Sequence, residues 1–276
     1  THGQVRWFTK ELQHKGLIEK ISIESFNNFV AATFVAITAD SGEAQKLSGK
    51  PASSSPPVQW GAGLHTLIVG GGSSHDFEKW FHQADQKTIE ESRQASVQYT
   101  SSTASLSSRL NDVDVLYLSN NQPITDREAR NTILHWPSNK GMLLVHPALW
   151  YNWNDWPEYN SQLVGGGARS HDAYGEFEVT IEKKDHPVTA GVPEHFRLKD
   201  ELYHFEKAAG SDIEVLATGK NIKTGESYPL LWIVHAKDKN VGRIVCLTLG
   251  HDADSHENPA YKKILTNALL WAGHKN

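Results

Sequence analysis

The sequence predicts an α/β fold, with a doubly wound, mainly parallel sheet and helices on both of its faces. Four short runs of β-branched and aliphatic residues predict strands, and each breaks off into small and polar residues (65–69, 113–118, 141–145 and 243–249). From His65 onward such runs alternate with amphipathic stretches. This order calls for a parallel sheet with right-handed crossovers. If the four strands are parallel neighbours, the residues that follow them meet at one edge.

The run 141–145 predicts the central strand. A continuous apolar run this short is typical of a strand buried on both faces. Pro147 cannot continue a hydrogen-bonded ladder, so the strand ends beside it. His146 is therefore expected at the carboxyl end of the strand, where open α/β sheets build their binding sites. The alternative is a core histidine whose ring is paired with a backbone carbonyl.

The remaining elements of the α/β domain follow in chain order. Helices are expected at 76–91, 104–111, 124–136 with Thr125 as a cap, and 259–272 with Pro259 in the first turn. Further strands are expected at 96–100, 175–184, 197–206, 213–218 and 228–236. Residues 148–172 are too polar for a core element and are expected to form a long loop.

The chain is expected to have two parts. Residues 1–62 predict an N-terminal β arm, with strands at 17–26 and 34–39 and a linker rich in Ser and Pro, and residues 63–276 form the α/β domain. Two strands cannot make an independent domain. They must pair with a sheet edge in their own or a neighbouring chain, so a homodimer through these strands is one option.

Composition narrows the class of partner. The chain is 38% hydrophobic and 21% charged, which is ordinary for a globular protein. The net charge of -5, with dispersed basic residues, argues against a nucleic-acid or anionic-membrane partner. No apolar run approaches the roughly 20 residues of a membrane span. We therefore expect a small neutral ligand. The chain begins at Thr1, and the compartment stays open between the cytoplasm and a periplasmic or secreted location reached after signal removal.

Three histidines are the candidate catalytic residues, because each is expected just beyond a strand. His75 follows a glycine-rich turn, His146 ends the central strand and His251 precedes Asp252. The alternatives are a tight turn for the glycines and a helix cap for Asp252. We expect substrate to bind at Gly71, Gly72 and Ser73 of the turn, through their backbone groups, and at Asn120 in the loop after residue 118.

Two further stretches are expected to contribute to the site. Trp150 and Trp153 lie near carboxylates in the segment after His146, and exposed indoles suit sugar rings. The alternative is that they anchor the loop on the sheet. If 197–206 is one alternating strand, Glu201 and Tyr203 face one way and Asp200 the other. We favour Glu201 and Tyr203 as the pair that faces the site.

Other chemistries have weaker support in the sequence. Three histidines near carboxylates raise the question of zinc, but no spacing such as HExxH is present and the residues come from separate strands. We therefore expect no metal ligands and no required cofactor, with zinc at the histidine cluster as the less favoured option. Cys246 is expected to be buried and inert, and the absence of a Gly-x-Ser-x-Gly elbow argues against a serine hydrolase.

Several stretches together resemble one family. They are GGGSSHDF, HPALW, GGGARSHDAYGEFEV, DHPVTAG, DELYHF and LGHD, and the resemblance to the trehalose-utilisation (ThuA-like) family runs from His65 to Gly273. The family is similar in fold to class I glutamine amidotransferases, which implies a flavodoxin-like sheet. Those enzymes carry a catalytic cysteine on the turn after a central strand, where this chain has His146, so the resemblance implies no glutaminase activity. It implies a role in the catabolism of disaccharides or their keto forms.

Three hypotheses for function follow. In the first, the chain is an enzyme in which His75, His146 and His251 give acid, base or electrophilic help, and Asp252 or Glu201 orients a histidine. In the second, it is a non-catalytic sugar-binding module. In the third, its role is structural, with the N-terminal strands as the contact.

Overall fold

The structure is a computed structural model that describes residues 59–275. The chain divides into two compact units, Thr1–Pro57 and Val58–Asn276, and the description below concerns the second. The expected β arm and any dimer that it forms lie outside the described residues. No helix in the described part is long and apolar enough to cross a membrane.

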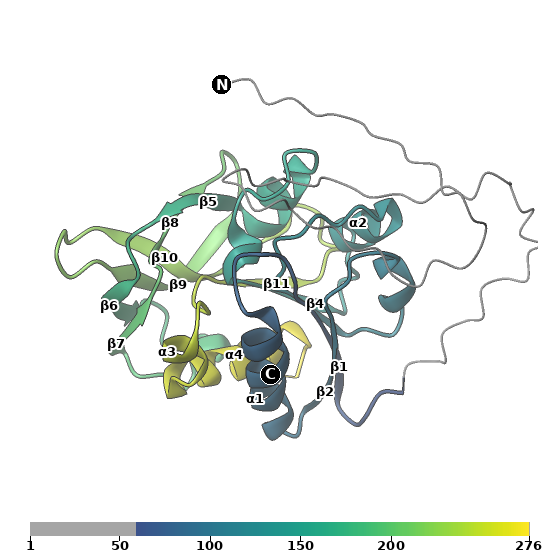
Figure 1. Cartoon of the computed structure of the whole chain (residues 1–276), viewed down its shortest axis with the longest axis horizontal. Helices are drawn as coiled ribbons and strands as arrows, with labels where there is room; N and C mark the ends of the chain where they lie inside the picture. Colours follow the sequence, from purple (N-terminus) through teal and green to yellow (C-terminus); the bar gives the residue numbers. More distant parts are fainter. Residues whose placement is uncertain (1–58, 276) are drawn as a thin grey trace, which may run out of the picture. The chain divides into compact units, whose positions relative to one another are not determined.

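One mixed sheet of nine strands organises this unit, in the order β2-β1-β3-β4-β11-β10-β9-β6-β7 (Figure 1). The pairings among β2, β1, β3, β4 and β11 are all parallel, and those from β11 to β7 are all antiparallel. The parallel half has the strand order of a flavodoxin-like doubly wound sheet, with β11 as its fifth strand. The predicted fold class is confirmed. A second sheet pairs β5 with β8.

The strands of the large sheet are β1 (Leu64–Val69), β2 (Ala95–Thr100), β3 (Val115–Leu118), β4 (Gly141–Val145), β6 (Gly175–Ile181), β7 (His195–Asp200), β9 (Ile213–Lys220), β10 (Ser227–Val234) and β11 (Arg243–Leu247). The small sheet contains β5 (Gly166–His171) and β8 (Tyr203–Lys207). The α-helices are α1 (Gln86–Glu91), α2 (Arg127–Leu134), α3 (Ala253–His256) and α4 (Pro259–Ala272), and π-helical segments span Glu78–Asp85 and Tyr159–Val164.

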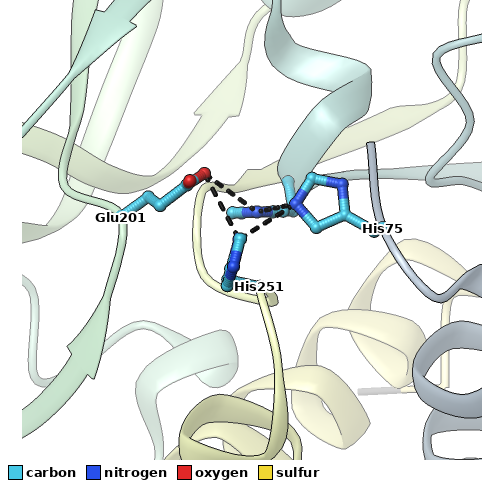
Figure 2. Close-up of side chains that lie close together, drawn as sticks. His75, Glu201 and His251 are labelled. Atoms are coloured by element: carbon cyan, nitrogen blue, oxygen red, sulfur yellow. Dashed lines mark hydrogen bonds and ion pairs between the residues drawn. The ribbon is translucent and has the colours of Figure 1, made fainter. Parts of the chain in front are cut away.

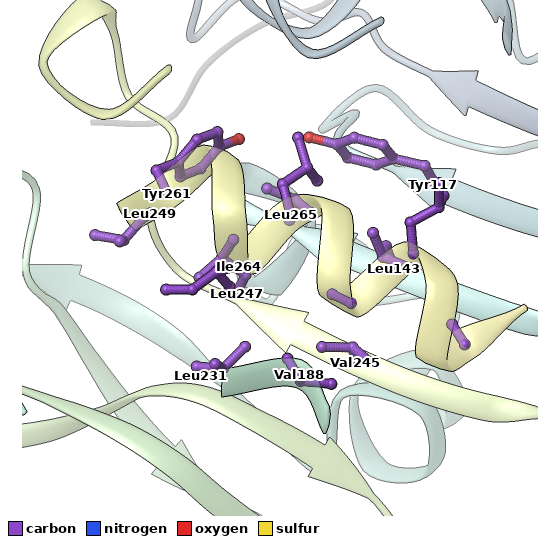
Figure 3. Close-up of a cluster of buried hydrophobic side chains, with 14 of the residues drawn as sticks. Tyr117, Leu143, Val188, Leu231, Val245, Leu247, Leu249, Tyr261, Ile264 and Leu265 are labelled. Atoms are coloured by element: carbon purple, nitrogen blue, oxygen red, sulfur yellow. The ribbon is translucent and has the colours of Figure 1, made fainter. Parts of the chain in front are cut away.

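Helices cover both faces of the sheet. On one face, side chains of α1 and α4 join strand residues such as Leu143 and Val245 in one buried cluster. Figure 3 shows the part of this cluster that α4 covers. On the other face, α2 and the segment Tyr159–Val164 pack against residues such as Leu144 in a second cluster. Because β4 is buried on both faces, all five of its residues are apolar or glycine, as its sequence predicted.

Two of the expected helices differ from the structure. Residues 104–111 form only a short turn of 3-10 helix at Leu106–Arg109, where the Ser108 hydroxyl donates to the carbonyl of Ser105 and competes with helical hydrogen bonding. Ser105 has a positive φ of 54°, which also interrupts the helix. Helix α2 is capped by Asp126, whose carboxylate accepts a hydrogen bond from the backbone N–H of Ala129, and not by Thr125.

The expected strand 197–206 is two strands in different sheets. β7 ends at Asp200 and pairs with β6, whereas β8 begins at Tyr203 and pairs with β5. The chain changes sheet at Glu201 and Leu202, so the expected alternation along this stretch was wrong. Residues 148–172 were also expected to be one loop, but they contain β5 and the helical segment Tyr159–Val164.

Candidate functional site

The three predicted histidines meet at the carboxyl edge of the parallel strands. His75 follows β1, His146 follows β4 and His251 follows β11. His75 Nε2 lies 3.0 Å from His146 Nε2 and 3.1 Å from His251 Nδ1. Figure 2 shows the rings of His75 and His251 directed toward one another, with Glu201 on the side opposite His75. The prediction of a shared edge is confirmed.

His146 occupies a strained backbone position at the end of the central strand. Its φ is 50°, in the left-handed region that a non-glycine residue adopts at a cost. The side chain is completely buried, and its Nδ1 lies 2.6 Å from the carbonyl oxygen of Thr248. A carbonyl can only accept, so Nδ1 carries the proton and Nε2 presents a lone pair to the cluster. Tyr203 stacks on the ring, with the centroids 4.8 Å apart.

His75 is held by the glycine-rich turn after β1. Gly71 and Gly72 have φ values of 108° and 136°, which side chains rarely adopt. His75 Nδ1 lies 2.6 Å from Ser74 Oγ, and Asn121 Nδ2 donates to the same oxygen at 2.8 Å. These contacts orient the ring so that Nε2 faces the other histidines.

Glu201 completes the cluster from the point where the chain leaves β7. Its Oε2 lies 3.4 Å from His251 Nδ1 and 3.7 Å from His146 Nε2. The side chains of Glu201 and His251 are 15% and 29% exposed, so the cluster is partly open to solvent on this side. Glu201 thus lies beside the histidines, although the single strand that suggested this does not form, and its catalytic role stays a prediction.

Asp200, which the expected alternation turned away from the site, is a positioning residue. It is buried, and its Oδ2 accepts hydrogen bonds from the backbone N–H groups of Gly250 at 2.8 Å and His251 at 3.4 Å, and from the Ser255 hydroxyl. Burial raises the pKa of Asp200. The carboxylate thus holds the turn that presents His251.

The environment separates the pKa values of the four groups. Burial, together with the neighbouring histidines, lowers the pKa of His75 to about 3, and burial lowers the pKa of His146 to about 3. The hydrogen bond to Glu201 raises the pKa of His251. Burial opposes ionisation of Glu201, but the His251 hydrogen bond and nearby histidines lower its pKa to about 2. At neutral pH, His75 and His146 are neutral and Glu201 is ionised.

Asp252 serves as a helix cap, the alternative considered for it. Its carboxylate accepts from the backbone N–H of Asp254 at the start of α3. The Tyr174 hydroxyl, which has one proton to donate, lies 3.0 Å from Asp252 Oδ1 and 2.8 Å from Asp254 Oδ2, and the Tyr174 ring lies 5.2 Å from His251. Asp252 thus contacts Tyr174, whose ring lies against His251, and the catalytic role of Asp252 stays a prediction.

The two tryptophans have different environments. Trp153 is only 4% exposed and packs against Trp156 and Tyr159, so it anchors its loop in the core and is not an exposed sugar platform. Trp150 is half-buried and meets the edges of Tyr203 and His171, beside the cluster. Of the pair, Trp150 alone is placed to border a ligand.

The remaining predicted substrate-binding groups lie in turns near the sheet edge. Asn120 is fully buried, and its amide donates to the carbonyl of Gln122 at 3.0 Å. Gly72 and Ser73 are exposed, whereas Gly71 is buried. A role in substrate binding for these residues stays a prediction.

His171 is a neighbour of the site that the sequence did not single out. Its Nε2 lies 3.5 Å from Glu201 Oε1, and its side chain is 33% exposed. The repeat of Gly-Gly-Gly followed by His-Asp, at 70–76 and again at 165–172, was a signal that could have found it. As a set, His75, His146, His251 and Glu201 place one donor atom each within 4.8 Å of one another, which is compact enough to raise the question of a metal ion.

The strand order and the histidine edge define an α/β protein with a flavodoxin-like core. Solved structures agree. A ThuA-like protein of Parabacteroides merdae superposes with a TM-score of 0.65 at 20% identity, over 77% of this chain and 90% of that one. A ThuA-like protein of Bacteroides uniformis gives a TM-score of 0.63 at 20% identity, over 78% of this chain and 94% of that one.

The sequence itself identifies the family. The family model for ThuA, described as trehalose utilisation, matches residues 66–272, so the chain belongs to the ThuA family. No curated protein matches the chain. The family gives the chain a carbohydrate-related role, in agreement with the resemblance found in the sequence.

Proposed function

We propose that this chain is an enzyme of carbohydrate catabolism that acts on a disaccharide or its keto derivative at the cluster of His75, His146, His251 and Glu201. The supporting observation is the convergence of three imidazoles and one carboxylate at the carboxyl edge of the sheet. Binding a neutral sugar needs hydrogen bonds and stacking. Several titrating groups in contact suit proton transfer or polarisation of a carbonyl.

The opposite pKa shifts support a division of roles. His75 and His146 are neutral at pH 7 and offer lone pairs, whereas His251 has a raised pKa beside an ionised Glu201. Groups whose environments push their pKa values apart are typical of acid and base pairs. In this proposal His251 donates a proton, His75 or His146 accepts one or holds an electrophile, and Glu201 orients His251.

Aromatic side chains around the cluster support a sugar as the substrate. Trp150 borders it beside His171, and Tyr174, which is 40% exposed, lies against His251. Flat apolar faces with polar groups at their edges suit a sugar ring. The net charge of -5 gives no reason to expect an anionic substrate.

Incubation with a panel of disaccharides and their 3-keto derivatives, followed by mass detection of products, tests the proposal. The wild-type chain should convert at least one substrate. Replacement of His251 by Gln should slow this conversion, and replacement of His235, which is 49% exposed and pairs with Glu214 away from the cluster, should not. Equal rates for His251→Gln and wild type would contradict the proposal.

The second candidate is a sugar-binding module without catalysis, favoured by the aromatic border that Trp150 provides. In that case, calorimetry would detect saturable binding of a sugar that the chain leaves unchanged. Trp150→Ala would then weaken the binding, and His251→Gln would have little effect.

A further inference from the structure

No assignment of protons to neutral rings satisfies every contact within the cluster at once. His146 Nε2 has no proton, because the ring donates from Nδ1 to Thr248. A proton on His75 Nε2 can point at His146 or at His251, which lie 3.0 and 3.1 Å away. If His251 Nδ1 carries a proton and donates it to Glu201, this N–H group also lies next to the N–H group of His75. In this arrangement His75 pairs with His146 and His251 pairs with Glu201, and the one poor contact is between the two N–H nitrogens, which lie 3.1 Å apart.

The separations between the donor atoms suit one shared cation. With Zn–N distances of about 2.0–2.1 Å, two ligands on a tetrahedral ion lie about 3.3 Å apart. Four of the separations here are 3.0, 3.1, 3.4 and 3.7 Å. All four donor atoms lie within 4.8 Å of one another. A shift of about 1 Å by the more exposed His251 and Glu201 would bring all four into binding distance of one ion.

The neighbours of the cluster hold the rings as metal ligands are usually held. A metal-binding histidine commonly donates its other ring N–H to a carbonyl, a carboxylate or water, which fixes the tautomer. His146 has this partner in the carbonyl of Thr248, and His75 has a hydroxyl partner in Ser74.

We propose that the cluster binds one divalent transition-metal ion, with zinc as the representative, through His75 Nε2, His146 Nε2, His251 Nδ1 and one oxygen of Glu201. Imidazole and carboxylate donors suit zinc. The sequence argued against this site because it has no local spacing motif. The ligands come from four separate segments, which only the sheet order brings together.

An ion bound by all three histidines would replace their acid-base roles, including the proton donation proposed for His251, and this step rests on the proposed function. A lone pair that binds a metal cannot accept a proton from a sugar. The ion would give electrophilic help by polarising a sugar carbonyl or hydroxyl. Proton transfer would then fall to a neighbouring group, and His171, exposed and 3.5 Å from Glu201, is placed for it.

Metal binding to the full chain tests the inference without any sugar. After removal of bound metal with a chelator, zinc is titrated by calorimetry and the bound metal is measured by mass spectrometry. We expect one tightly bound equivalent per chain. Cobalt, used in place of zinc, should give the visible absorption of a tetrahedral ion. A wild-type chain that binds neither ion would overturn the inference.

Variants separate this site from histidines elsewhere on the chain. Glu201→Gln and His251→Gln, whose side chains are partly exposed, should fold and should bind zinc at least about 100-fold more weakly, since even the loss of an outer partner costs 10- to 100-fold. His235→Gln should bind as wild type. If both cluster variants, folded by circular dichroism, keep the wild-type affinity, the ion is adventitious and the inference fails. Sugar turnover that persists in a metal-free chain would leave the proposed function standing and remove only the metal from it.

Discussion

Two histidine-carboxylate groups lie close together in this domain and have opposite hydrogen-bonding arrangements. In the buried network, His256 Nδ1 lies 2.7 Å from Asp85 Oδ1, and His256 Nε2 lies 3.0 Å from the carbonyl of Gly250. The hydroxyls of Tyr117 and Tyr261 donate to Asp85 Oδ2 at 2.6 and 2.9 Å. Each polar atom of this network faces a suitable partner.

In the cluster at the sheet edge, by contrast, ring nitrogens face one another. His256 is as buried as His146, yet both of its nitrogens face acceptors, so the network is complete without a ligand. His146 Nε2 instead faces another ring nitrogen, His75 Nε2, at 3.0 Å, so a substrate, a proton or an ion can complete this cluster. Burial alone therefore does not make a histidine structural.

The strongest test of this difference is His146→Asn. Asparagine tolerates the left-handed backbone at this position, so the fold should persist. We expect turnover to fall by about 100- to 10,000-fold, the usual range for loss of an acid-base group. Turnover is measured on the active disaccharide or keto-sugar, with thermal melting of the same sample. A variant that melts early yet turns over normally would make His146 a structural residue like His256.

Asp85→Asn should have the opposite effect. Removing one partner of a buried ion pair costs about 3–5 kcal/mol, because the other charge is left without compensation. We expect chemical denaturation to show a loss of that order. Turnover per folded molecule should stay near the wild-type value. A large loss of turnover at unchanged stability would mean that the two groups are not separate.

The pH dependence of stability should also distinguish the buried His256 network from the histidine cluster at the sheet edge. Burial alone would lower the pKa of His256, but the Asp85 carboxylate raises it overall above 6.5. A raised pKa in the folded state stabilises the protein fully below pH 6.5, and this contribution disappears as the pH rises through the folded-state pKa. The free energy of unfolding of wild type should therefore exceed that of Asp85→Asn most at pH 6 and less at higher pH. A constant difference would show that His256 stays neutral.

The smallest expected effect concerns the border of the site. Tyr174→Phe removes the hydroxyl that donates to Asp252 or Asp254, and an exposed hydrogen bond of this kind contributes about 0.5–1.5 kcal/mol. We expect stability to change by no more than this. If Tyr174 stacks on the sugar, KM should change little in Tyr174→Phe and rise in Tyr174→Ala, as steady-state kinetics would show.

The sequence predicted the elements whose signals are local. The apolar runs before Gly70 and His146 marked strand ends, and α4 was predicted with the bounds that it has. The errors arose where a long-range contact decides the structure. Trp153 is held in the core by residues of its own loop and of the sheet, so its burial could not be predicted from spacing alone. Asp126 caps α2 and also accepts a hydrogen bond from Ser107, a contact that spacing alone does not show.

What the sequence by itself determined was which chemical groups end the parallel strands, because hydrophobic periodicity and the residues that break it are properties of short segments. That was sufficient to place His75, His146 and His251 at one edge. The tertiary structure alone decided which ring nitrogens face each other. It depends on the strand order, on the left-handed backbone of His146 and on the change of sheet that brings in Glu201, all of which are set by packing between distant parts of the chain.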